Sequence, residues 1–123
     1  MTTLLKELHT LLAPTLRKRL YLAMSYPTAP PDTMIALFPE HLRYMKQFES
    51  EIFLSGPFIK DGQLVGEFMT ILRTDSEVRA AEFMRNEPFV RHGLRRFDLK
   101  LWEMREGSLT MTAKLSESSV DIR

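Results

Sequence analysis

The apolar residues between Leu20 and Trp102 change their spacing several times, and this succession limits the folds that the chain can adopt. Residues 20–26 place an apolar side chain at every second position, which is typical of a buried strand. Residues 32–52 instead repeat apolar side chains with the helical period of about 3.6 residues, and Pro39 suits the first position of the regular helix. The spacing therefore predicts a strand followed by a helix.

Two further strands follow as neighbours in the chain. Residues 52–55 and 64–72 form β-like apolar runs, and Asp61-Gly62 lies between them. An Asp-Gly pair supplies the positive φ angles that a tight hairpin needs. We therefore expect these two strands to pair antiparallel.

A second helix and a fourth strand complete the pattern. Thr74 is followed three residues later by Glu77, which is the spacing of a capping box. The helix that begins there is expected to end near Pro88. Residues 97–102 then alternate apolar and charged side chains, which predicts a strand.

The predicted order βαββαβ is typical of an α+β sandwich of the ferredoxin-like type, with one antiparallel sheet and two helices on one of its faces. The opposite face of such a sheet is apolar and stays uncovered in a single copy. Pairing two copies across a two-fold axis would bury both open faces in a β-barrel-like interface. The sequence therefore predicts a homodimer.

The two ends of the chain carry additional elements. Leucines recur at helical spacing before Pro14, so residues 1–15 are predicted to be an N-terminal helical extension. Residues 109–113 alternate and predict a short C-terminal hairpin strand that folds back on the fourth strand. We expect one domain over residues 16–115 and a flexible tail over residues 116–123.

Composition excludes several classes of function. The chain has no cysteine, so neither a disulfide framework nor a thiolate metal site is possible, and we expect a cytoplasmic location. Its formal net charge of +1 favours no polyanionic partner. No apolar run approaches the roughly 18–20 residues of a membrane span. We therefore expect a soluble protein that binds neither nucleic acid nor a membrane.

Metals and cofactors have no signature in this sequence. The three histidines lack a metal-binding spacing, and the five glycines are too scattered for a phosphate-binding loop. We expect no metal and no cofactor. A basic cluster could bind a carboxylate or a phosphate, but acidic residues are interleaved with it, which favours a solvated or dimer-rim role. The cluster consists of Arg85, Arg91, His92, Arg95 and Arg96.

Five short motifs stand out in the predicted domain. In chain order they are His41-Leu42-Arg43-Tyr44, Leu54-Ser55-Gly56-Pro57, Asp61-Gly62, Gly66 and Glu87-Pro88-Phe89-Val90. Their order and spacing resemble the YCII-related (YciI-like) family. Members of that family have a histidine on the first helix, a small-Gly-Pro turn after the second strand, a glycine in the third strand and an acidic-Pro-aromatic motif after the second helix. The resemblance covers residues 20–102.

This resemblance implies a dimeric α+β barrel with an active site built on the histidine of the first helix and an acidic partner. Most members have no known activity, and one relative type eliminates chloride from a chlorinated hydroxyhydroquinone. The catalytic residues would be His41 with Glu87 or Asp61. The family more often has aspartate where this chain has Glu87, so this carboxylate reaches one methylene further. The residues that would bind substrate are Ser55, Gly56, Pro57 and Phe89.

Each candidate also has a structural explanation. Histidine is a common general base, so His41 can accept a proton from a substrate, or it can be a core-edge histidine bonded to a backbone carbonyl. Asp61 can serve the hairpin turn, and Glu87 can end the second helix as a solvated charge. Gly56 can be required by the turn after the second strand.

Two functions therefore stay open. The first is a small-molecule enzyme, an isomerase or a lyase similar to a dehydrochlorinase, in which His41 acts as general base on a polar, oxygen-rich substrate. The second is a non-catalytic dimeric module that binds a ligand or another protein, with the N-terminal helix as a docking element.

Overall fold

The computed structural model describes residues 2–13, 16–117 and 119–122. The described residues form two compact units, one within residues 19–103 and the other within residues 1–18 and 104–123. The candidate site lies entirely in the first unit. The domain boundaries expected near residues 16 and 115 stay a prediction.

The larger unit is built on a four-stranded sheet with the strand order β2-β3-β1-β4. The strands are β1 (Lys18–Pro27), β2 (Ile52–Lys60), β3 (Gln63–Leu72) and β4 (Arg95–Met104). β3 pairs antiparallel with both β1 and β2. β4 runs antiparallel to β1, because the end of β1 meets the start of β4, where the N–H of Thr28 donates to the carbonyl of Leu94. This arrangement confirms the predicted ferredoxin-like α+β fold.

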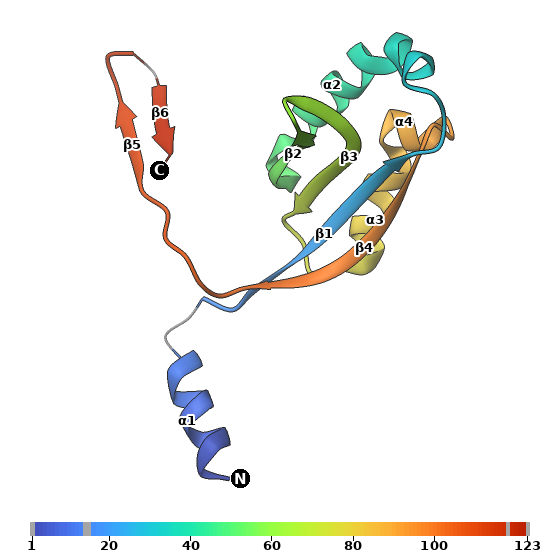
Figure 1. Cartoon of the computed structure of the whole chain (residues 1–123). Coiled ribbons are helices and arrows are strands. Elements are labelled where there is room, and N and C mark those ends of the chain that lie inside the picture. The colour runs from blue at the N-terminus through green and yellow to red at the C-terminus, as the bar shows by residue number, and fades with distance from the viewer. Residues whose placement is uncertain (1, 14–15, 118, 123) are drawn as a thin grey trace. The chain divides into compact units, whose positions relative to one another are not determined.

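Helices cover one face of this sheet (Figure 1). The helical segments are a 3-10 helix (Pro31–Leu37), α2 (Phe38–Gln47), a 3-10 turn (Glu49–Glu51), α3 (Glu77–Asn86) and the short α4 (Pro88–Arg91). Pro39 lies in the first turn of α2, where its missing N–H leaves no helical hydrogen bond unmade. The core between sheet and helices is formed by Ala23, Leu72, Ala80, Phe83 and Met84.

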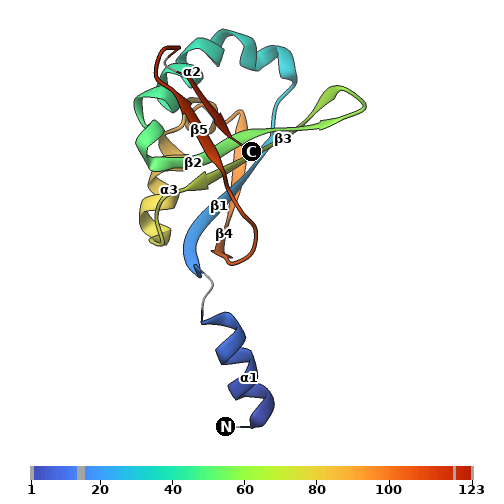
Figure 2. The ribbon, with the colours of Figure 1, turned by 90° about the vertical axis from the view of Figure 1, so that its left-hand side faces the viewer.

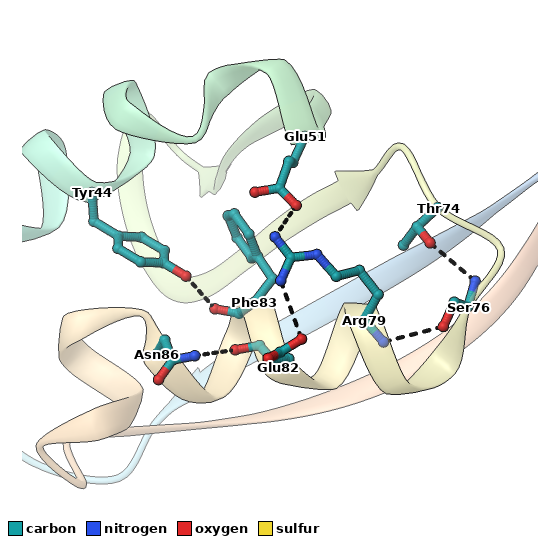
Figure 3. Close-up of polar contacts among 8 residues, drawn as sticks. All are labelled: Tyr44, Glu51, Thr74, Ser76, Arg79, Glu82, Phe83 and Asn86. Atoms are coloured by element: carbon teal, nitrogen blue, oxygen red, sulfur yellow. Dashed lines mark hydrogen bonds and ion pairs between the residues drawn. The ribbon is translucent and has the colours of Figure 1, made fainter.

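The loop before α3 differs from the prediction. Ser76 is the residue that caps the helix, because its backbone is extended and its Oγ accepts a hydrogen bond from the N–H of Arg79 at 3.2 Å. The Oγ1 of Thr74 accepts from the N–H of Ser76 at 3.1 Å and so shapes the loop (Figure 3). The predicted capping box of Thr74 with Glu77 is therefore wrong, since the helix begins two residues later than a Thr74 cap requires.

β2 and β3 form the predicted hairpin, which projects beyond the other strands of the sheet (Figure 2). Asp61 and Gly62 at its turn have φ angles of 53° and 75°, the left-handed conformation expected from Asp-Gly. β2 is longer than the predicted run and includes Pro57. This proline is tolerated because β2 is an edge strand, and the register shifts just after Pro57.

The smaller unit contains α1 (Thr3–Leu12) and a two-stranded sheet of β5 (Met111–Lys114) and β6 (Ser119–Ile122). Thr2 caps α1 by accepting from the N–H of Leu5 at 3.2 Å. β5 pairs with β6, which corrects the predicted pairing of the C-terminal strand with the fourth strand. β6 also lies within the segment 116–123 that was expected to be a flexible tail. In the described segments no helix has the length and apolar composition to cross a bilayer.

Side-chain contacts fasten α2 to α3 on the side away from the sheet (Figure 3). The hydroxyl of Tyr44 on α2 donates a 2.7 Å hydrogen bond to the backbone carbonyl of Phe83 on α3. Arg79 forms ion pairs with Glu51 in the turn after α2 and with Glu82 on its own helix. These contacts hold together the two helices whose residues line the candidate site.

The phenol of Tyr44 makes the stability of the fold dependent on pH in the alkaline range. Burial, together with the negative charge of Glu51, raises the pKa of Tyr44 from its ordinary value of 10.0 to about 12. Between these two values the unfolded chain releases the proton and the folded chain keeps it, so the free energy of unfolding falls as the pH rises from about 10 to about 12. We expect Tyr44→Phe to lose this part of the alkaline dependence in urea denaturation, whereas Tyr26→Phe keeps it. Parallel curves for wild type and Tyr44→Phe would contradict this.

Candidate active site

A cavity of about 150 Å³ lies between the sheet and the helices of the larger unit. All four strands of the sheet, the first 3-10 helix, α2, α3 and α4 contribute to its lining, which is mostly apolar. Among the lining residues, Ser25, His41, Thr70 and Glu87 are polar or charged side chains that are buried. A buried apolar cavity with a few convergent polar groups is the usual form of a small-molecule site.

The imidazole of His41 occupies an aromatic enclosure in this cavity. His41 lies on α2 one turn after Phe38, so both side chains point to the same face of the helix. The ring of Phe89 stacks on the imidazole with a centroid separation of 4.7 Å, and the rings of Phe38 and Phe68 contact it edge-on at 5.8 and 6.0 Å. Only 8% of His41 is exposed, so its ring orientation is set by packing.

Glu87 supplies the partner of His41. It lies between α3 and α4, with an extended backbone, and its Oε2 caps α4 by accepting from the N–H of Val90 at 3.3 Å. Its Oε1 accepts a 2.5 Å hydrogen bond from the Nδ1–H of His41. Glu87 is only 4% exposed, so it is not a solvated charge at the end of the helix. The imidazole likewise bonds to this carboxylate and not to a backbone carbonyl.

The hydrogen bond to Glu87 defines the state of the other imidazole nitrogen. A carboxylate accepts from Nδ1 only if that atom carries the proton, so the neutral imidazole keeps a lone pair on Nε2. Within the described residues, no buried side-chain nitrogen or oxygen lacks a partner, and Nδ1 is the only ring atom of His41 with a hydrogen bond. Nε2 is therefore accessible, and the cavity is the space that His41 lines. This arrangement can accept a proton from a bound molecule.

The other predicted site residues divide into two groups. Pro57 and Phe89 line the cavity. Ser55 does not line it, but its hydroxyl bonds at 3.2 Å to the hydroxyl of Thr70, which does. Gly56 and Asp61 are not part of the lining, and Asp61 is an exposed residue of the hairpin turn. The structure thus brings Glu87, and not Asp61, to His41.

Arg95 is a cavity residue that sequence reasoning assigned to a solvated basic cluster. It precedes Phe97 and Leu99 at the alternating spacing of β4, and those two residues pack on the core. Residues two positions apart in a strand face the same side, so this spacing could have indicated that Arg95 also faces the helices. The expected solvated character does hold for Arg91, which forms an exposed ion pair with Glu40 at 2.8 Å.

The described part of the chain contains no group of three or more histidine, cysteine, aspartate or glutamate side chains placed to hold a metal ion. A carboxylate that holds an imidazole in one tautomer is the arrangement that general-base catalysis uses.

Glu87→Ala should destabilise the fold markedly, because it leaves the buried Nδ1–H of His41 without an acceptor and removes the cap of α4. We expect the free energy of unfolding to fall by about 3 kcal/mol. Glu87→Gln keeps an acceptor oxygen and should lose less. Urea denaturation is the measurement, and exposed Glu49→Ala, expected within about 0.5 kcal/mol of wild type, is the control. A loss below about 1 kcal/mol in Glu87→Ala would show that the pair is not formed.

Comparison with known proteins identifies a fold relative and no sequence family. No protein-family model matches the chain, and no curated protein is detectably similar in sequence. Among solved structures, 5-chloro-2-hydroxyhydroquinone dehydrochlorinase from Burkholderia phenoliruptrix AC1100, in complex with 2,5-dihydroxybenzoquinone, superposes with a TM-score of 0.56. The match has 20% sequence identity and covers 67% of this chain and 92% of the dehydrochlorinase. At this identity the likeness establishes that the two chains share a fold.

Proposed function

We propose that this protein is a small-molecule enzyme in which His41 acts as general base on a ring compound bound in the cavity. The observation that carries the proposal is the buried hydrogen bond from His41 Nδ1 to Glu87, which leaves Nε2 as a free acceptor on a side chain that lines the cavity. Glu87 orients the imidazole and stabilises the imidazolium that forms when a proton is transferred.

The reaction class is a proton transfer that leads to isomerisation or elimination. Nε2 takes a proton from a C–H or O–H bond of the substrate, and the electron pair of that bond moves into the ring system. In an isomerisation, the imidazolium returns the proton to another atom of the same molecule. In an elimination, a leaving group departs with its bonding electron pair. Both routes balance without a metal or a redox cofactor.

The size of the cavity supports a substrate with one ring. An apolar cavity of about 150 Å³ in another protein is known to hold benzene, and the cavity here has about that volume. The aromatic side chains around His41 offer faces and edges on which a flat ring can stack. The dehydrochlorinase that shares this fold is named for a single-ring hydroquinone and was solved with a single-ring quinone. These features favour phenols, quinols and quinones as the first compounds to assay.

We expect His41→Gln to lower turnover strongly while the protein remains folded. Single-ring compounds would first be screened by thermal shift, where a ligand at about 100 times its dissociation constant stabilises the protein by about 2.7 kcal/mol. Hits would then be incubated in D2O and followed by NMR for deuterium uptake or release of a leaving group. The loss in His41→Gln should be about 100-fold or more, because general-base catalysis contributes at least that factor.

His92→Gln is the matched control, because His92 is exposed and lies outside the cavity lining. It should keep full turnover. Equal turnover in wild type and His41→Gln would refute the proposed base. Ligands that bind the wild type without any chemical change would favour the alternative of a non-catalytic binding module.

We further propose that the protein is a homodimer in which the open faces of two sheets pack together as a dimeric α+β barrel. Ala23 packs in the core, so its neighbours Leu22 and Met24 on β1 point to the face without helices. Their cross-strand partners Ile71 and Met69 on β3 point the same way. Ile71 is already buried, and a second copy would remove the rest of this apolar face from water.

Leu54→Glu should convert the dimer to a monomer. Leu54 pairs with Ile71 in the ladder and is 58% exposed, so a charge there disturbs the proposed interface more than the fold. Val78→Glu is the control, because Val78 is 78% exposed on α3, in the helical layer. Sedimentation velocity at micromolar concentration should show a dimer for wild type and Val78→Glu. A monomeric wild type would rule out the shared interface.

A further inference from the structure

Arg95 enters the cavity from the first residue of β4 and is held there by the backbone of two other strands. Its Nε donates to the hydroxyl of Ser25 at 2.7 Å, and its Nη2 donates to the carbonyls of Ser25 at 3.0 Å and Gly66 at 2.5 Å. Ser25 is itself only 4% exposed. Three acceptors therefore fix the guanidinium in one position, unlike an arginine that moves freely at a surface.

The remaining donors of Arg95 have no strong acceptor. Among the described residues, the only hydrogen-bond acceptor of Nη1 is the sulfur of Met34 at 4.0 Å, and a thioether is a weak acceptor. Both Met34 and Arg95 line the cavity. The hydrogen-bonding capacity left on this guanidinium is therefore available where a ligand would bind.

The charge of Arg95 also lacks a paired carboxylate. Other arginines of the described chain, such as Arg79, Arg91 and Arg96, have an acidic side chain within ion-pair distance. Among the residues that the structure describes, Arg95 forms hydrogen bonds only with neutral oxygen and sulfur atoms. Burial lowers its pKa, and the charge of Glu87 opposes that shift from a distance. A half-buried cation of this kind is costly until an anion lies beside it.

We propose that the cavity selects a single-ring compound bearing an oxyanion, a carboxylate or a phenolate, and that Arg95 binds this oxyanion through Nη1. The inference rests on the proposed function, whose substrate class it narrows. The ring would occupy the apolar part of the cavity near Phe68 and Phe89. The cavity, at about 150 Å³, is too small for a nucleotide-sized ligand. Arg95 thus sets specificity, whereas His41 performs the chemistry.

Benzoate and benzamide test this proposal directly, because they have nearly the same shape and differ in charge. Isothermal titration calorimetry of the wild-type protein should give a dissociation constant for benzoate at least 10-fold lower than for benzamide. Equal affinities, tighter binding of benzamide, or binding of neither compound at millimolar concentration would overturn the proposal. This comparison needs no variant, so it does not depend on whether a substitution folds.

Substitutions then assign the preference to a residue. Arg95→Gln should bind benzoate and benzamide within 2-fold of each other, and Arg95→Lys should keep part of the preference for benzoate. Arg85→Gln removes the same charge from an exposed position on α3 outside the cavity and should keep the full preference. An unchanged preference in a folded Arg95→Gln protein would overturn the assignment.

The same ligands separate this inference from the proposed enzyme function. His41→Gln should retain the benzoate preference, because the proposed oxyanion contact does not involve the imidazole. A protein that prefers benzoate through Arg95 but performs no proton transfer would refute the enzyme function and leave this inference standing. A protein that turns over neutral rings and shows no preference for benzoate would support the enzyme function and overturn this inference.

Discussion

The hydrogen bond between His41 and Glu87 is the interaction on which the candidate site depends. It joins α2 to the start of α4 across 46 positions in the chain, and both side chains are buried. Glu87 uses its second carboxylate oxygen to cap α4, so it cannot turn toward solvent without uncapping that helix. The local secondary structure therefore fixes the carboxylate, and the carboxylate in turn fixes the tautomer of the imidazole.

The surroundings of this pair support the proposed proton transfer on a small ring. Three aromatic side chains contact the imidazole of His41, a residue that is only 8% exposed, and electrostatic interactions are stronger where water is excluded. Glu87 and Arg95 place one negative and one positive charge at the same cavity. A base and an anion-binding group can then act on different parts of one bound molecule, which is how an enzyme orients a substrate for reaction.

The sequence predicted the fold better than the site. The alternating and helical spacings identified the βαββαβ order because burial on one face leaves a regular trace in the chain. The motif around His41 identified the histidine, and the turn at Asp61-Gly62 was readable from its residues. The burial of Glu87 could not be predicted from the sequence, because a glutamate before a proline equally suits the exposed end of a helix. The pairing of β5 with β6 also left no trace, since both strands are exposed on both faces.

The central claim is that Glu87 holds His41 with a proton on Nδ1 and a lone pair on Nε2. Two-bond and three-bond 1H–15N correlation NMR of the imidazole, at a pH where the ring is neutral, reads this tautomer directly. We predict the pattern of an Nδ1–H tautomer for His41 in the wild type, and loss of that single tautomer in Glu87→Ala, which removes the acceptor of the Nδ1–H. An Nε2–H tautomer in the wild type would contradict the account, because Nε2 would then be a donor and not a base.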